Sequence, residues 1–145
     1  MPLFTDLNAD FKKMAAGIES DALKAELTLQ LEDYIDAINK VLAASHITLR
    51  LRIRTEGEDH HLSYAQFNRE VPYAKVKFDV KKEEASITPE GKKAERLTFS
   101  EFKKRILRDV FERLDMDERV RFAGGFRTVI AQLDKPKELA GPAVV

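Results

Sequence analysis

The segment from Ile47 to Arg54 places the strongest constraint on how this chain folds. Apolar and polar residues alternate strictly along it, with Ile47, Leu49, Leu51 and Ile53 on one side and Thr48, Arg50, Arg52 and Arg54 on the other. A period of two is typical of a β-strand with one buried face and one solvated face. We therefore expect a strand here whose outer face is basic.

A second segment, from Tyr73 to Lys81, alternates in the same way. Its apolar side carries Ala74, Val76, Phe78 and Val80, and its polar side carries Tyr73, Lys75, Lys77, Asp79 and Lys81. If the two strands are neighbours, Leu49, Leu51, Val76 and Phe78 are buried together. The opposite face then forms a candidate site for an anion or a nucleic acid, made of Arg50, Arg52, Arg54, Tyr73, Lys75, Lys77 and Lys81. Tyr73 is the aromatic residue available on that face for stacking on a base.

Helical periodicity precedes the first strand. Apolar residues at three- and four-residue steps predict an amphipathic helix over about Thr5–Ile18, with Leu7, Phe11, Met14 and Ile18 among them. Gly17 and the Ser20–Asp21 pair predict a stop and a new N-cap. A longer helix then follows over about Asp21–Ala44, and Leu29 lies off its apolar stripe.

Two capping boxes predict helices in the C-terminal part of the chain. Thr98 followed by Glu101 begins a helix that ends near Leu114, and the box at Asp115–Glu118 begins another that stops at Lys135–Pro136. Gly124–Gly125 lies in the middle of the second helix, where we expect a kink, a break or a close backbone contact.

The segment between the two clear strands allows two interpretations. Ser63 with Gln66 matches a capping box, and Leu62 with Phe67 would form the accompanying hydrophobic staple, which predicts a short helix over Tyr64–Glu70. Alternatively, His60–Phe67 is the return strand of a hairpin. We favour the helix, and Pro72 ends either element. Ala85–Thr88 is a further short strand, followed by the turn Pro89–Gly91 and a charged connector over Lys92–Arg96.

These elements predict one α+β domain. A chain of 145 residues with 43% hydrophobic residues is long enough for a single core. We expect a small sheet of two to four strands, covered on one face by N-terminal and C-terminal amphipathic helices. The domain spans residues 1–136, and residues 137–145 form a C-terminal tail.

Composition limits the classes of function. The chain has 25 Lys and Arg against 25 Asp and Glu, so its formal net charge is zero, whereas a DNA-binding domain usually carries a basic excess. It has no cysteine, which excludes disulfides and thiolate chemistry. The N-terminal segment does not resemble a signal peptide, and no apolar stretch is long enough to cross a bilayer. We therefore expect a soluble, cytoplasmic protein that does not bind membranes.

The sequence contains no recognisable catalytic motif, phosphate loop or dinucleotide fingerprint. His60 and His61 lie beside Glu56, Glu58 and Asp59, but adjacent residues of a strand point to opposite faces, so we expect no metal site there. We expect no cofactor and no catalytic residues, although an enzyme stays open because residues on loops can lack a local signature.

We therefore expect a non-catalytic protein-interaction or assembly subunit that self-associates, with a dimer favoured and a different protein as another partner. The long helix or the sheet edge would form the interface. The alternative is a nucleic-acid-binding module that uses the basic sheet face.

Overall fold

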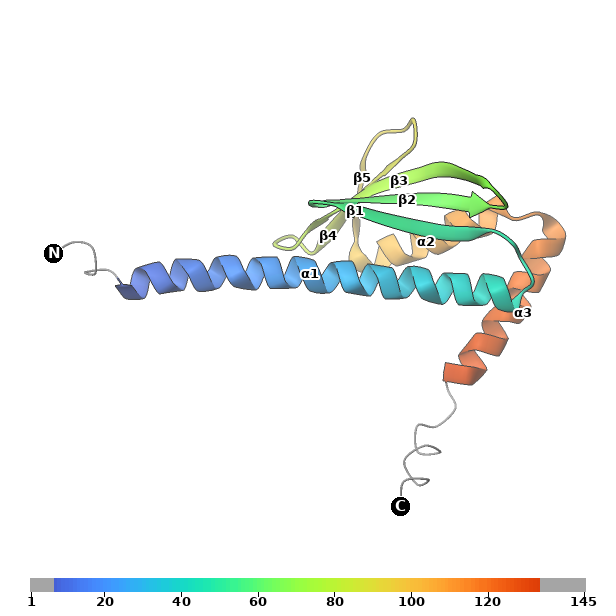
Figure 1. Ribbon diagram of the computed structural model, residues 1–145, viewed down its shortest axis with the longest axis horizontal. Helices are drawn as coiled ribbons and strands as arrows, with labels where there is room; N and C mark the ends of the chain where they lie inside the picture. Colours follow the sequence, from blue (N-terminus) through green and yellow to red (C-terminus); the bar gives the residue numbers. More distant parts are fainter. Residues whose placement is uncertain (1–6, 134–145) are drawn as a thin grey trace, which may run out of the picture.

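The structure is a computed structural model, and it describes residues 7–133. In chain order the elements are α1 (Leu7–Ala44), β1 (Arg50–Glu56), β2 (Asp59–Gln66), β3 (Arg69–Asp79), β4 (Glu84–Pro89), β5 (Glu95–Thr98), α2 (Phe99–Arg113) and α3 (Met116–Leu133). The strands form one antiparallel sheet in the order β1-β2-β3-β4-β5, and α1 and α2 lie along one of its faces (Figure 1). The α+β class is confirmed, with five strands in place of the expected two to four.

The N-terminal helices predicted separately are one helix. α1 has 38 residues and continues through both Gly17 and Ser20–Asp21. A glycine inside a helix costs roughly 1 kcal/mol relative to alanine, and the long helical segments on either side outweigh that cost. The predicted start at Thr5 lies outside the described residues.

His46 ends α1 and turns the chain toward the sheet. It has a φ of 57°, and the backbone N–H groups of His46 and Ile47 donate to the carbonyls of Ala43 (3.1 Å) and Leu42 (2.9 Å). This pair of hydrogen bonds is the Schellman motif, which satisfies carbonyls that the helix end leaves without a partner. Arg121 of α3 adds a hydrogen bond to the His46 carbonyl (2.9 Å), and its positive charge suits the C-terminus of a helix.

β2 is a strand, so the helix expected over Tyr64–Glu70 is wrong and the alternative hairpin is confirmed. β1 and β2 pair from Arg50 opposite Ala65 to Glu56 opposite Asp59. Ser63 does not cap a helix; its hydroxyl donates to the Glu70 carboxylate (2.6 Å) on β3. The expected staple residue Phe67 is instead exposed in the β2–β3 turn.

β3 extends through Pro72, which was expected to end the preceding element. Its pairing with β2 shifts between Leu62 and Ser63, because Leu62 faces Ala74 while Ser63 faces Pro72. Tyr73 is therefore the extra residue of a β-bulge. Pro72 is tolerated here because β4 pairs only from Ala74 onward, so that this end of β3 is an open edge.

β4 matches the predicted strand, whereas β5 lies partly in the segment predicted to be a connector. β5 has four residues and pairs with β4 from Thr98 opposite Glu84 to Glu95 opposite Ile87. Such a short, charged strand shows too little alternation to be predicted.

Both predicted C-terminal helices are confirmed, with their capping boxes. Thr98 accepts from the Glu101 N–H (3.2 Å), and the Glu101 carboxylate accepts from the Thr98 N–H (3.1 Å). Asp115 and Glu118 exchange the equivalent bonds before α3. α3 continues through Gly124–Gly125 without a break, and Gly125 makes the close contact, against the end of α1. The predicted domain end at 136 and the tail over residues 137–145 lie outside the described residues.

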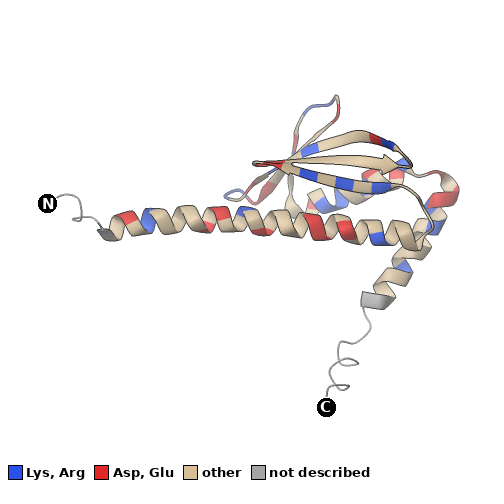
Figure 2. Cartoon of the chain, in the orientation of Figure 1, with Lys and Arg blue, Asp and Glu red and all other residues tan. Residues whose placement is uncertain are grey.

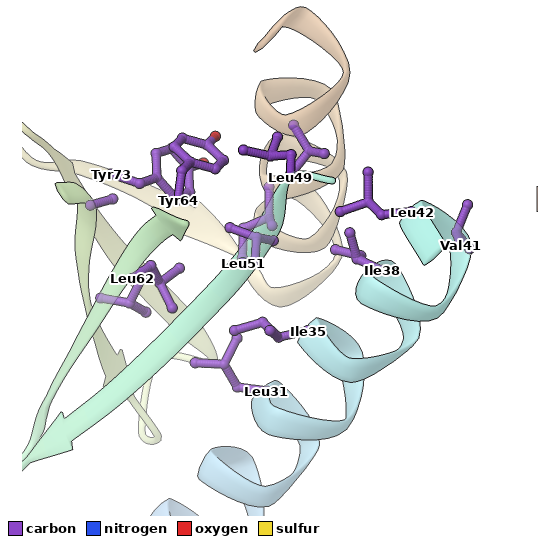
Figure 3. Close-up of a cluster of buried hydrophobic side chains, with 14 of the residues drawn as sticks. Leu31, Ile35, Ile38, Val41, Leu42, Leu49, Leu51, Leu62, Tyr64 and Tyr73 are labelled. Carbon is purple, nitrogen blue, oxygen red and sulfur yellow. The ribbon is translucent and has the colours of Figure 1, made fainter. Parts of the chain in front are cut away.

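The core lies between the sheet and the helices. Leu31, Ile35 and Ile38 of α1 point toward Leu51 and Leu62 of the sheet (Figure 3). α2 adds its own buried side chains, Phe102, Ile106 and Val110. Of the four residues expected to be buried together, Leu49, Leu51 and Val76 are buried, and Phe78 packs half-buried against the same core.

Candidate functional site

Basic residues alternate along β1 (Figure 2) with Leu51, which is buried toward the helices, so they lie on the face of the sheet that α1 and α2 leave open. The strand registers place Arg54 of β1, His61 of β2, Lys75 of β3 and Thr88 of β4 side by side. We call these four residues the cross-strand row. The row joins residues up to 34 positions apart in the sequence, and it exists only because β2 is a strand.

The three arginines of β1 have different environments. Arg50 is half-buried, and its guanidinium donates to the backbone carbonyls of Leu49 (2.7 Å) and Ile47. Arg52 is exposed. Arg54 pairs with Glu56 (3.1 Å), whose carboxylate also lies 3.9 Å from the His61 ring.

The three candidate lysines do not form a single patch. Lys75 is exposed within the cross-strand row, whereas Lys77 pairs with Asp59 (3.5 Å) on the neighbouring strand. Lys81 lies in the β3–β4 turn, beside Ser20 and Lys24 of α1.

Tyr73 lies in the core and not with the lysines. The bulge changes its side of the strand, its exposure is 8%, and its ring packs against Tyr64 with centroids 4.8 Å apart. The simple alternation from which we placed it on the basic face therefore fails at this position.

Tyr73 belongs to a polar cluster that joins the sheet to α2. Its hydroxyl donates to Asp109, which also pairs with Arg105 (3.1 Å). The guanidinium of Arg113 lies 4.4 Å from the centre of the Tyr64 ring. Burial raises the pKa of both tyrosines, and the pKa of Tyr73 is raised further by the bond to Asp109, so both phenols stay protonated and Tyr73 acts as a donor. This arrangement stabilises the α2–sheet contact and contains no activated nucleophile.

The two adjacent histidines lie on opposite faces. His60 is buried, and its Nδ1 lies 2.9 Å from the Thr55 hydroxyl; burial lowers its pKa. His61 belongs to the outer face. Within residues 7–133, no group of three or more His, Asp or Glu side chains is placed to hold a metal ion.

A depression of about 610 Å³ lies over the cross-strand row. All four residues of the row line it, and Lys92 of the β4–β5 loop lines it from the side. That loop rises from the sheet on the side away from the helices (Figure 1). Glu70 and Glu90 also line the depression. Its lining therefore carries both positive and negative side chains.

The N-terminal half of α1 provides a second candidate surface. It extends past the sheet (Figure 1), and residues 8–19 are exposed throughout. Phe11, Met14, Ile18 and Leu29 are each more than half exposed, at 57%, 59%, 66% and 61%. The first three were expected to form the inward face of a short helix, but no other helix or strand within residues 7–133 covers them.

These exposed side chains share one face of α1. Eleven residues are about three helical turns, so Ile18 and Leu29 point the same way. Nine residues are about two and a half turns, so Leu29 points away from Ile38, which is buried against the sheet. Ala22 and Ala25 fall between them on the same side. We call Phe11, Met14, Ile18, Ala22, Ala25 and Leu29 the α1 stripe.

A groove of about 480 Å³ lies between α1 and α2, on the sheet side of α1. Its apolar lining comes from Leu27, Leu31, Tyr34, Phe78, Phe99 and Phe102. The Tyr34 hydroxyl closes part of it by donating to the Lys103 carbonyl (2.6 Å). The apolar lining of the groove is continuous with the hydrophobic core, because Leu31 and Phe102 belong to both.

Comparisons of the chain with family models, curated proteins and solved structures gave no significant match. In residues 7–133, none of the helices combines the length and apolar character that crossing a bilayer requires.

Proposed function

We propose that this protein is a non-catalytic interaction module that self-associates through the α1 stripe. The observation that carries the proposal is the row of exposed apolar side chains on the face of α1 opposite the sheet. Large apolar patches on a soluble protein usually mark a contact with another molecule. An isolated helix is also marginally stable in water, so the part of α1 beyond the sheet gains from a partner helix.

A second copy of the chain suits this stripe. Large residues precede its small residues, Ala22 and Ala25, and the large residue Leu29 follows them. An antiparallel two-fold pairing centred near residue 20 places Ile18 against Ala22 of the second copy, and Met14 against Ala25. Large and small side chains then interdigitate at the centre of the pairing, as close helix packing requires, and Leu29 meets a large residue at each end.

Charge makes the strength of this pairing depend on salt. Asp21 lies beside the centre of this pairing, so two copies bring their Asp21 carboxylates close together. Salt screens repulsion between exposed charges and strengthens apolar association. The dimer is therefore expected to be more stable at high ionic strength, whereas pairing that depended on salt bridges would weaken.

The test is the oligomeric state, measured by sedimentation velocity over a range of concentrations. Ile18→Glu places a charge in the stripe and is expected to give a monomer at concentrations where the wild type is a dimer. Ala16→Glu is the matched control, because Ala16 is exposed on the same part of α1 but on another face. A wild type that stays monomeric at high concentration, or equal dissociation in both variants, would contradict the proposal.

A nucleic-acid-binding function, the alternative, has weaker support. Carboxylates interleave with the basic residues, because Glu56 contacts Arg54 and Asp59 contacts Lys77. Tyr73 is buried and is not available for stacking on a base.

A further inference from the structure

We propose that the cross-strand row binds a compact, multiply charged anion: a small phosphorylated ligand held by Arg54, His61 and Lys75. This binding site is independent of self-association, because it lies on the sheet face away from α1. Three observations carry the proposal: the register of the strands, Lys75, which forms no ion pair within residues 7–133, and the depression above the row.

The register brings two cationic side chains and a histidine onto adjacent strands. Neighbouring strands are about 4.8 Å apart, so Arg54 and Lys75 begin roughly 10 Å apart with His61 between them. Their long side chains can converge on a ligand above His61. Thr88, next in the row, adds a hydroxyl that can donate to an oxyanion.

Carboxylates balance only part of the row. Glu56 contacts Arg54 and His61, but within the described part of the chain Lys75 forms no ion pair. A bound anion would give Lys75 a partner of opposite charge, and charge-assisted hydrogen bonds to an oxyanion are among the strong ones in proteins.

The depression sets the size of the ligand. Its volume of about 610 Å³ lies within the range of about 300–1,000 Å³ that is usual for small-molecule sites. Lys92 lines it from the β4–β5 loop and adds a further positive charge.

The surrounding carboxylates favour a compact ligand over a nucleic acid. Glu56 and Asp59 lie at the β1–β2 end of the face, and Glu70 and Glu90 line the depression. The Ser63 hydroxyl donates to Glu70 (2.6 Å), which holds one of these carboxylates beside Ser63. A polynucleotide backbone that crossed the row would meet these carboxylates, whereas a small anion can remain above the cations.

The probe is pyrophosphate, titrated into the full-length protein at low ionic strength and followed by isothermal titration calorimetry. We expect binding, and a weakening of roughly tenfold or more in Lys75→Gln, because each charge-assisted contact is worth about that factor. Lys40→Gln is the control, since it removes the same charge from an exposed position on α1. His61→Gln gives a second test within the row, and circular dichroism checks that each variant is folded.

The possible results separate the alternatives. Weaker binding in Lys75→Gln and His61→Gln, with Lys40→Gln unchanged, supports the site. No pyrophosphate binding by the wild type, or equal weakening in Lys40→Gln, overturns it. Binding of a single-stranded oligonucleotide that excess pyrophosphate does not displace also overturns it, and favours nucleic acid as the ligand of this face.

Discussion

Gly125 is the residue at which α3 meets the end of α1. A Cβ added there would lie 1.9 Å from the Ser45 Oγ and 2.8 Å from the Val41 carbonyl oxygen. Because the carbonyl belongs to the α1 backbone, a side chain at this position requires one helix to move. Gly125 therefore allows the close contact between α3 and α1. Gly124 has open space around it and takes no part in this contact.

We predict that Gly125→Ala and Gly124→Ala change stability in opposite directions. Gly125→Ala is expected to lower the free energy of unfolding by roughly 1–3 kcal/mol, as overpacking commonly does. Gly124→Ala is expected to raise it by up to about 1 kcal/mol, because alanine favours the helix. Urea denaturation measures the free energy of unfolding of each variant. Two changes of the same sign and size would show that the close contact at Gly125 does not determine the effect of the added methyl group.

The tyrosines make the protein sensitive to alkaline pH. The chain has three, and burial raises the pKa of Tyr34, Tyr64 and Tyr73 above the ordinary value near 10. Their folded-state pKa values exceed the unfolded ones, so their contribution to stability is complete below about pH 10 and is lost as the pH rises above it.

We predict that phenolate absorbance appears together with the loss of structure in an alkaline titration. Circular dichroism on the same samples supplies the second signal. Three phenols that ionise near pH 10 in a protein that stays folded would show that their burial is not maintained in solution.

Single residues also mark the limits of sequence-based prediction. The alternation of Leu49, Leu51 and Val76 gave their burial correctly: Leu51 and Val76 lie in regular stretches of β1 and β3, and Leu49 lies directly before β1. Tyr73 was placed on the wrong face, since a bulge depends on pairing with β2 and leaves no local signal. The cross-strand row was missed for a related reason, because it depends on the register of four strands.

At the scale of elements, two similar capping boxes had different outcomes. Thr98 and Glu101 cap α2, whereas Ser63 and Gln66 lie in β2. Strong apolar periodicity follows Thr98, and α2 buries Phe102, Ile106 and Val110. No such periodicity follows Ser63, and pairing with β1 and β3 on both sides overrides the local preference.

We predict that Thr98→Ala lowers the free energy of unfolding by roughly 0.5–2 kcal/mol. Glu101→Ala in the same background should add less than it costs alone, because the two residues form one reciprocal pair of hydrogen bonds. Thermal denaturation of the single and double variants measures the difference, and fully additive losses would indicate that the two bonds act independently.

At the scale of the whole molecule, α1 has two parts with different surroundings. Leu31, Ile35 and Ile38 are buried against the sheet, whereas residues 8–19 are exposed. Sequence periodicity predicted helix in both parts, but it could not show that the first part extends past the sheet. That extension depends on the size of the sheet and on where α1 lies across it.

We predict that hydrogen exchange in the two parts of α1 responds differently to protein concentration. Pairing of the α1 stripe should slow exchange at residues 8–20 as the concentration rises, while exchange at residues 31–42 stays unchanged. Mass spectrometry of the exchanged protein resolves the two segments. Exchange at residues 8–20 that is fast at every concentration would contradict pairing through this helix.

The order of strands in the sheet has a consequence for folding kinetics. Each strand pairs with its neighbour in the sequence, so the sheet can form one hairpin at a time with little loss of chain entropy. The contact between α1 and α3 differs, because it joins Ser45 to Gly125, and all five strands of the sheet lie between these two residues in the sequence. We expect this contact to form after the folding barrier and to open before the sheet does, so that α3 undocks first when the protein begins to unfold.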